Sequence, residues 1–249
     1  MASRDEMSRS FGAEADAYQT GRPEYPAEAV AWLLEPVADR SPRVADVGAG
    51  TGKLTRAVLA AGASEVVAID PDPDMLASLR AATTGVPTHE GTAEALPLPD
   101  ASVDAVVLGQ AWHWVDPESG SAEIGRVLTP GGVLGLIWNI RDSSVPWVGR
   151  MGEIMHNSNA EIMIADGGPV VAAPFGEPER RDWSWSRTIT RDGLFAMARS
   201  RSYLITASDE DRAAVEAELG VLFDEIGAVG EQTVELPYIT SAFRYRRAD

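Results

Sequence analysis

The stretch VADVGAGTGKL, residues 44–54, joins a short apolar run to three glycines spaced two residues apart. Glycine accepts left-handed backbone conformations and lets a bound molecule approach the main chain, so this loop is typical of a ligand site. The same glycines could instead form only a tight turn between a strand and a helix. The spacing therefore has to be compared with loops whose ligands are known.

Two phosphate-binding loops do not fit this spacing. A Walker loop requires G-x-x-x-x-G-K-[ST], but Leu54 follows Gly52-Lys53. Its first glycine is also missing, because Val47 stands at that position. A dinucleotide loop requires G-x-G-x-x-G, and Lys53 replaces its third glycine. An NAD-dependent oxidoreductase is therefore the less favoured alternative.

The spacing that is present is acid-x-G-x-G-x-G, which begins at Asp46. It suits S-adenosylmethionine, whose methionine part must lie along the loop backbone. Asp46 can favour the ammonium of that ligand, directly or through water. Asp70 ends the next apolar run, and its carboxylate can accept hydrogen bonds from both ribose hydroxyls. The alternative for Asp70 is a helix cap before Pro71.

S-adenosylmethionine carries a methyl group on a sulfonium, which it can transfer to an acceptor. This transfer needs a catalytic base only when the acceptor must lose a proton. His113, in GQAWHWVDP, is the best candidate for that catalytic base. Alternatively, His113 belongs to a packed turn with its neighbouring tryptophans. A carboxylate acceptor needs no base, and Arg22 is suited to bind one. The candidate substrate-binding residues are Tyr18, Arg22, Tyr25, Trp112, Trp114, Trp147 and Met151.

Apolar and amphipathic segments alternate up to residue 140, which predicts a parallel sheet with helices on both faces. The ligand then lies at the carboxyl ends of the strands. The expected strands are 43–48, 64–70, 87–91, 103–110 and 132–139, and the helices between them are 51–61, 72–82 and 117–128. Beyond residue 140 we expect helices at 147–165 and 208–227, and strands at 183–190 and 234–247 that pair antiparallel.

The order and spacing of four stretches, VADVGAGTG, VVAIDPDPDML, GTAEALPLPDASVDAVV and EIGRVLTPGGVLGLIWN, resemble the class I S-adenosylmethionine-dependent methyltransferases. YQTGRPEYP and QAWHWVD are similar to a small-molecule subgroup that includes trans-aconitate and ubiquinone/menaquinone-type methyltransferases. The resemblance implies a doubly wound, mostly parallel seven-stranded α/β sheet whose last strand is antiparallel. It also implies cofactor-binding roles for Asp46, Gly48, Ala49, Gly50, Thr51, Gly52, Asp70, Pro71, Met75, Thr92, Ala93, Glu94 and Gln110.

The expected organisation is a single methyltransferase domain over 1–249. Residues 1–40 are expected to form a lid over the cofactor, and residues 141–205 an insertion beside the acceptor. The expected reaction is methyl transfer to a small molecule, with O-methylation of a carboxylate or hydroxyl favoured. The alternatives are a protein that binds the same cofactor for non-methyl chemistry and one that binds it for regulation.

The composition of the chain excludes or disfavours several classes of binding partner. The chain has no cysteine, so disulfides, thiolate nucleophiles and cysteine-bound metals are excluded, and no metal site is expected. A net charge of −17 without a basic stripe disfavours nucleic acid. No apolar run reaches the roughly 18 residues of a membrane helix, and the polar start is unlike a secretory signal. We therefore expect a cytoplasmic protein without membrane contact, and leave its oligomeric state open.

Overall fold

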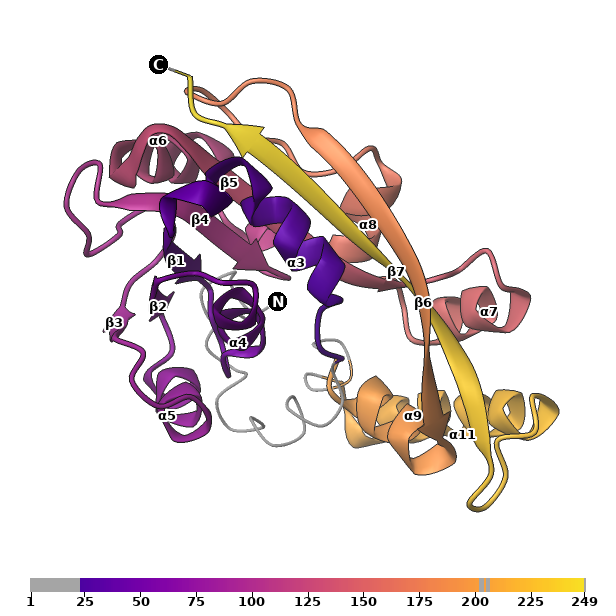
Figure 1. Cartoon of the computed structure of the whole chain (residues 1–249). Coiled ribbons are helices and arrows are strands. Elements are labelled where there is room, and N and C mark those ends of the chain that lie inside the picture. Colours follow the sequence, from indigo (N-terminus) through magenta and orange to yellow (C-terminus); the bar gives the residue numbers. More distant parts are fainter. Residues whose placement is uncertain (1–22, 202–203, 205–206, 249) are drawn as a thin grey trace.

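The computed structural model describes residues 23–201, 204 and 207–248, which are arranged around one seven-stranded sheet (Figure 1). The strand order is β3-β2-β1-β4-β5-β7-β6. The first five strands are parallel, and β7 lies antiparallel between β5 and β6, which confirms the expected sheet. The strands are β1 Arg43–Val47, β2 Glu65–Asp70, β3 Thr88–Glu90, β4 Val103–Gly109, β5 Leu128–Arg141, β6 Glu179–Thr190 and β7 Thr233–Arg246.

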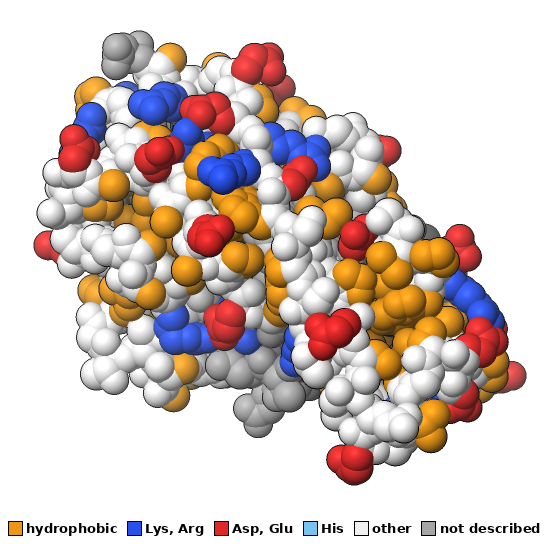
Figure 2. All heavy atoms as spheres, turned by 45° about the vertical axis from the view of Figure 1, so that its right-hand side comes forward, with side chains coloured by type: hydrophobic (Ala, Val, Ile, Leu, Met, Phe, Trp, Pro, Cys, Tyr) orange, Lys and Arg blue, Asp and Glu red, His pale blue; other side chains and the backbone are white. Residues whose placement is uncertain are grey.

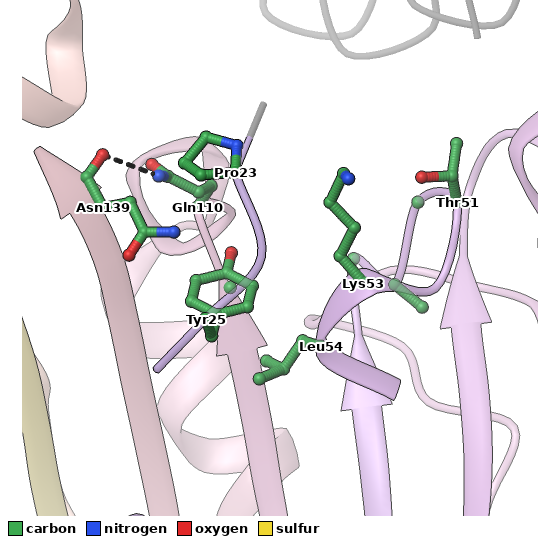
Figure 3. A pocket seen from close by; sticks show the side chains of 11 residues that line it. Pro23, Tyr25, Thr51, Lys53, Leu54, Gln110 and Asn139 are labelled. Carbon is green, nitrogen blue, oxygen red and sulfur yellow. Dashed lines mark hydrogen bonds between the residues drawn. The ribbon is translucent and has the colours of Figure 1, made fainter. Parts of the chain in front are cut away.

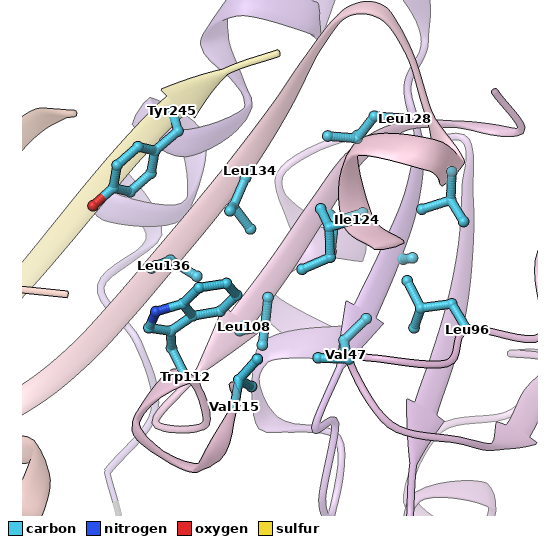
Figure 4. Close-up of a cluster of buried hydrophobic side chains, with 14 of the residues drawn as sticks. Val47, Leu96, Leu108, Trp112, Val115, Ile124, Leu128, Leu134, Leu136 and Tyr245 are labelled. Atoms are coloured by element: carbon cyan, nitrogen blue, oxygen red, sulfur yellow. The ribbon is translucent and has the colours of Figure 1, made fainter. Parts of the chain in front are cut away.

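The central strands β1 and β4 are mostly apolar and largely buried, as expected where helices cover both faces of a sheet. On one face, α3 (Ala27–Leu34) and α4 (Lys53–Ala60) enclose a core with residues of β1, β4 and β5. On the other face, α6 (Pro117–Val127) and α8 (Asn159–Ala165) border a second core, which includes Ile124, Leu128 and Leu136 (Figure 4). α5 (Pro73–Ala82) covers β2 and β3.

A third core belongs to a separate set of helices, which we call the helical lobe. It consists of α7 (Pro146–Ile154), α9 (Arg191–Arg199), α11 (Asp209–Glu225) and the adjoining ends of β6 and β7. Figure 1 shows β6 and β7 running past the carboxyl ends of the parallel strands toward α9 and α11. Phe223 and Tyr238 lie in this core, so the long hairpin joins the lobe to the sheet.

Side-chain caps explain where several helices begin. Asp72 accepts hydrogen bonds from the Asp74 and Met75 N–H groups at the start of α5, and Ser208 accepts one from Asp211 at the start of α11. Both starts were expected from the sequence. Strands 183–190 and 234–247 do pair antiparallel, as β6 and β7.

Three elements differ from the prediction. The single helix expected over 147–165 is wrong, because His156 adopts φ +57° and Ser158 begins α8 with a capping box to Glu161. α3 and α9 were not predicted. α3 buries Val30 and Leu33 against the sheet, so the described part of the expected lid includes a core helix. Within the expected insertion, residues 179–190 belong to the sheet as β6.

The surface shown in Figure 2 carries acidic and basic side chains interspersed, with an apolar patch over the helical lobe. Val221 and Val229 are among the large apolar residues that are more than half exposed. No described helix has both the length and the apolar character to cross a membrane.

Candidate functional site

The glycine loop lies where β1 ends, and its backbone is left-handed at Gly48, Gly50 and Gly52, with φ of +68°, +54° and +83°. A Cβ on Gly48 would lie 2.7 Å from the Ala111 Cβ, so that position requires glycine. At Gly50 no atom of the described residues lies within 4 Å of an added Cβ. The loop is therefore packed tightly at one glycine and open to space at another, where a ligand can approach its backbone.

A pocket opens above this loop, between the carboxyl ends of β1 and β4 (Figure 3). This is the position at which α/β sheets bind ligands. The residues that line it are Pro23, Tyr25, Gly48, Ala49, Gly50, Thr51, Lys53, Leu54, Gly109, Gln110 and Asn139. Tyr25, Gly48, Ala49, Gly50, Thr51 and Gln110 were expected site residues, and the structure brings them together.

Asp70 fixes the loop from the next strand. Its Oδ2 accepts a hydrogen bond from the Gly50 N–H at 2.8 Å, and its Oδ1 accepts one from the Asp72 N–H at 2.9 Å. Asp72, not Asp70, is the N-cap of α5. Burial raises the pKa of Asp70 above its ordinary value. Each carboxylate oxygen can accept more than one hydrogen bond, so acceptor capacity for a hydroxyl group remains.

Asp46 lies beneath the loop and is fully buried. Its Oδ2 accepts a hydrogen bond from the Thr55 hydroxyl at 2.6 Å, and its Oδ1 has no hydrogen-bond partner among the described residues. Burial raises the pKa of Asp46 to about 7. The side chain does not line the pocket, so any effect on a bound cation passes through the loop rather than through direct contact.

Asn139 joins the far wall of the pocket to three other segments. Its carbonyl oxygen accepts a hydrogen bond from Gln110 Nε2 at 3.0 Å, and its Nδ2 donates to the Glu24 carbonyl oxygen at 3.2 Å. Its Oδ1 accepts one from the Thr240 hydroxyl at 2.7 Å. Gln110 itself adopts φ +57°. This network holds the end of β4 and the N-terminal segment against β5 and β7.

The other expected cofactor residues lie outside the lining of the pocket. Met75 and Ala93 are buried, and Thr92 is exposed in a turn that it closes with Ala95. Glu94 accepts a hydrogen bond from the Asp116 N–H at 2.9 Å, which ties this turn to the start of α6. Gly52 packs against Leu79, and Pro71 is half-buried after β2.

His113 belongs to η3, the single turn Trp112–Trp114 that follows β4, and its ring lies 4.8 Å from the Trp114 ring. It is not among the described residues that line the pocket. His113 thus lies in a turn beside a tryptophan, and its role as a catalytic base stays a prediction.

Two expected substrate contacts are corrected by burial. Trp112 is 2% exposed and its indole N–H donates to the Val170 carbonyl oxygen, while Met151 is fully buried in the core of the helical lobe. A side chain with no solvent-accessible surface lines no open pocket. Trp147 packs against the lobe core. Tyr18 and Arg22 lie outside the described residues.

The sequence reasoning missed Lys53, Leu54, Asn139, Gly109 and Pro23 as lining residues. Lys53 carried a signal, because it is the chain's single lysine and directly follows the glycine loop. Asn139 ends an expected strand, and strand ends form such sites. Within the described ranges, no cluster of three histidine, aspartate or glutamate side chains is arranged to hold a metal ion.

Comparison with known proteins agrees with this geometry. Residues 45–136 match the family model described as a methyltransferase domain. An uncharacterized methyltransferase of Mycobacterium tuberculosis is 44% identical over 248 residues, which cover 97% of each chain. A methyltransferase-like protein of Schizosaccharomyces pombe is 33% identical and covers 94% of each chain.

Two further matches concern the subgroup and the fold. A demethylmenaquinone methyltransferase of Chlorobaculum parvum is 36% identical over 95 residues, 38% of this chain and 39% of its own, which loosely supports the expected subgroup. A solved structure from Anaeromyxobacter dehalogenans, assigned as a type II methyltransferase, superposes with a TM-score of 0.64 at 22% identity. The superposition covers 91% of this chain and 98% of that one, and supports the fold.

Proposed function

The chain belongs to the class I S-adenosylmethionine-dependent methyltransferase family, and we propose that it transfers the methyl group of S-adenosylmethionine to a small-molecule acceptor. The observation that carries this proposal is the pocket above the left-handed glycine loop, whose Gly50 N–H donates a hydrogen bond to the Asp70 carboxylate. A loop without the Walker or dinucleotide spacing favours a ligand whose contact with it is not a phosphate.

The residues present fit this cofactor. The open space at Gly50 admits a ligand to the backbone, and Asp70 retains acceptor capacity for ribose hydroxyls. When it is ionised, the Asp46 carboxylate places negative charge beneath the loop, which favours a cationic ligand above it. We propose that Thr92, Ala93 and Glu94 border the adenine, with Pro71 and Met75 shaping the wall between adenine and ribose.

When bound, S-adenosylmethionine supplies a methyl group activated by a positively charged sulfur. The chain's own residues then have to align the two reactants. Gln110 and Asn139 fix one wall of the pocket, and Tyr25 lies against Gly109 at the end of β4. Good alignment of two reactants supplies roughly 7–11 kcal/mol of a reaction barrier, so positioning alone accounts for much of the rate.

The acceptor atom we propose is oxygen, with a carboxylate favoured over a hydroxyl. Among the described lining residues, none is histidine, aspartate or glutamate, the usual general bases. A carboxylate oxygen has no proton to lose before it is methylated. His113 acts as a base only for a hydroxyl acceptor, and only after a change of position.

The proposal extends to a cytoplasmic enzyme that acts on a metabolite and not on nucleic acid. Its support is the net charge of −17 and the interspersed charges of the face in Figure 2.

The test is turnover of a small-molecule metabolite extract with an isotopically labelled methyl donor, followed by mass spectrometry. We expect label in a low-molecular-weight product that alkaline hydrolysis releases, because methyl esters hydrolyse. Label only in added nucleic acid or protein would contradict the proposed acceptor class, and bound but unconsumed donor would favour a regulatory role.

A further inference from the structure

Lys53 is a cation in an otherwise uncharged pocket. It is the single lysine of a chain whose net charge is −17. Of the described residues that line the pocket, it alone carries a charged side chain. That side chain is only 11% exposed, although lysine normally keeps its ammonium in water. In Figure 3 it extends from the start of α4, with Thr51 on one side and Tyr25 and Gln110 on the other.

The ion pair of Lys53 with Glu24 does not neutralise the positive charge beside the pocket. One oxygen of Glu24, Oε1, accepts hydrogen bonds from Lys53 Nζ at 3.0 Å and from Arg56 Nη2 at 3.1 Å. One carboxylate is thus shared by two cations, and the three groups together carry a net charge of +1. Arg56 also donates to the Thr51 carbonyl oxygen at 3.1 Å, so it is held to the loop independently of Glu24.

This arrangement is poorly explained as a stabilising salt bridge. Glu24 is 57% exposed, and pairs with an exposed partner contribute about 1 kcal/mol or less. Arg56 already pairs with Glu24 from outside the pocket lining. Lys53 is the second cation on the same Glu24 oxygen, and it therefore gains little from this pair. Because it lies inside the pocket and is largely covered, it is available to an anion that enters the pocket.

We infer that Lys53 binds a carboxylate group of a molecule held in the pocket. An ammonium has three donors, one of which Glu24 uses, and its flexible stem lets it turn toward a second carboxylate while Arg56 keeps Glu24. The inference rests on the proposed function, which supplies two sources of such a group. One is the methionine carboxylate of the cofactor, and the other is a carboxylate of the acceptor.

The experiment compares the full chain with Lys53→Met and Lys53→Arg by calorimetric titration. The probes are S-adenosylhomocysteine and its decarboxylated analogue S-adenosyl-3-thiopropylamine, which keeps the amine. Arg150→Met is the matched control, because it also removes one positive charge from an ion pair, that with Glu225 in the helical lobe. Thermal melts of all variants establish that each one is folded.

If the carboxylate belongs to the cofactor, Lys53→Met weakens S-adenosylhomocysteine binding by about 10- to 100-fold, the value of a charge-assisted hydrogen bond. The affinity of Lys53→Met for the decarboxylated analogue stays that of the wild type, and Lys53→Arg retains part of the affinity for S-adenosylhomocysteine. If the carboxylate belongs to the acceptor, both adenosyl probes bind Lys53→Met normally. Succinate or citrate, added to protein saturated with S-adenosylhomocysteine, then binds the wild type and not Lys53→Met.

Equal affinities of the wild type and Lys53→Met for all four probes would overturn the role of Lys53 while leaving the proposed function intact. A wild type that binds neither adenosyl probe would overturn the proposed function itself. A loss of affinity in Arg150→Met as large as that in Lys53→Met would also contradict the inference, because net charge alone would then explain the effect.

Discussion

Two carboxylates, the buried Asp46 beneath the glycine loop and the largely covered Glu161 beside the helical lobe, lie in opposite electrostatic surroundings. Asp46 has one hydrogen bond, from Thr55, and no ion-pair partner among the described residues. Glu161 is paired with Arg141 and Arg201, each at 2.6 Å. Burial disfavours ionisation of both side chains, but the two guanidinium groups lower the pKa of Glu161, whereas the pKa of Asp46 rises to about 7.

Because their surroundings differ in this way, we assign Glu161 a role in stability and Asp46 a role in the functional site. The largely covered Glu161 carboxylate joins Arg141 of β5 and Arg201 to α8, and removing it would take away the carboxylate that both guanidinium groups share. A buried carboxylate without a cation costs stability whenever it is ionised. Such a cost is typical of functional sites, and a cationic ligand above the loop would offset it.

The largest effect is expected on the lobe side. Glu161→Gln should lower the free energy of unfolding at pH 7 by roughly 3–5 kcal/mol, because two largely buried guanidinium groups lose their partner. Urea denaturation measures this. Glu225→Gln is the control, since that exposed carboxylate pairs with Arg150 and should change stability by about 1 kcal/mol or less.

The difference in the free energy of unfolding between the wild type and Glu161→Gln should also depend on pH. The pKa of Glu161 is lowered in the folded state, so its contribution is complete above the ordinary carboxyl pKa and is lost as the pH falls below about 4. The difference between the wild type and Glu161→Gln should therefore shrink between pH 5 and pH 3. A difference that grows on acidification would contradict the pairing.

Asp46→Asn should show the opposite trend. The folded-state pKa of Asp46 is about 7, above the unfolded value, so the native state binds more protons and stability falls as the pH rises from about 4 to 7. A difference of about three pKa units corresponds to at most about 4 kcal/mol. In urea titrations at pH 5 and pH 8, Asp46→Asn should lose less stability than the wild type over this interval. Identical pH profiles would mean that Asp46 titrates normally.

On the loop side, Asp70→Ala should weaken S-adenosylhomocysteine binding by roughly 1.5–3 kcal/mol, the range for a lost hydrogen bond to a charged group. The matched control is Asp72→Ala, which removes the N-cap of α5 and costs roughly 0.5–2 kcal/mol of stability. We expect that variant to keep its affinity. Calorimetry on both variants tests the separation, and an equal loss of affinity would show that helix capping explains both.

The smallest effect is expected at His113. Since it lies outside the described pocket lining, His113→Ala should lower turnover less than tenfold once an acceptor is in hand. A loss of 10²–10⁴-fold with normal cofactor affinity would instead identify it as the general base.

The parallel half of the fold could be predicted from the sequence because its signals are local. Buried strands enter glycines, and Asp72 and Asp116 mark helix starts before prolines. Two helices, α3 in the sheet core and α9 in the helical lobe, could not be predicted as well. α3 and α9 are short, and what stabilises them is contact with β5, β7 and the lobe core, which no local pattern records.

In the candidate site, too, the residues that could be predicted are those with local signals in the sequence. The glycine loop and Asp70 are local features, and the sequence placed them correctly beside one another. Lys53 begins α4 and Asn139 lies in β5, which pairs with β4, so that both line the pocket through the arrangement of the strands, which is a tertiary property. Trp112 and Met151 were assigned to the acceptor from their type, although burial, which only the fold decides, places them in the core.

The most direct test of the account is a calorimetric titration of the wild-type chain with S-adenosylhomocysteine, with NAD as the comparison ligand. The account predicts saturable binding of one S-adenosylhomocysteine per chain, its loss in Gly50→Val, whose side chain would enter the open space at the loop, and no binding of NAD. Saturable binding of NAD without binding of S-adenosylhomocysteine would contradict it.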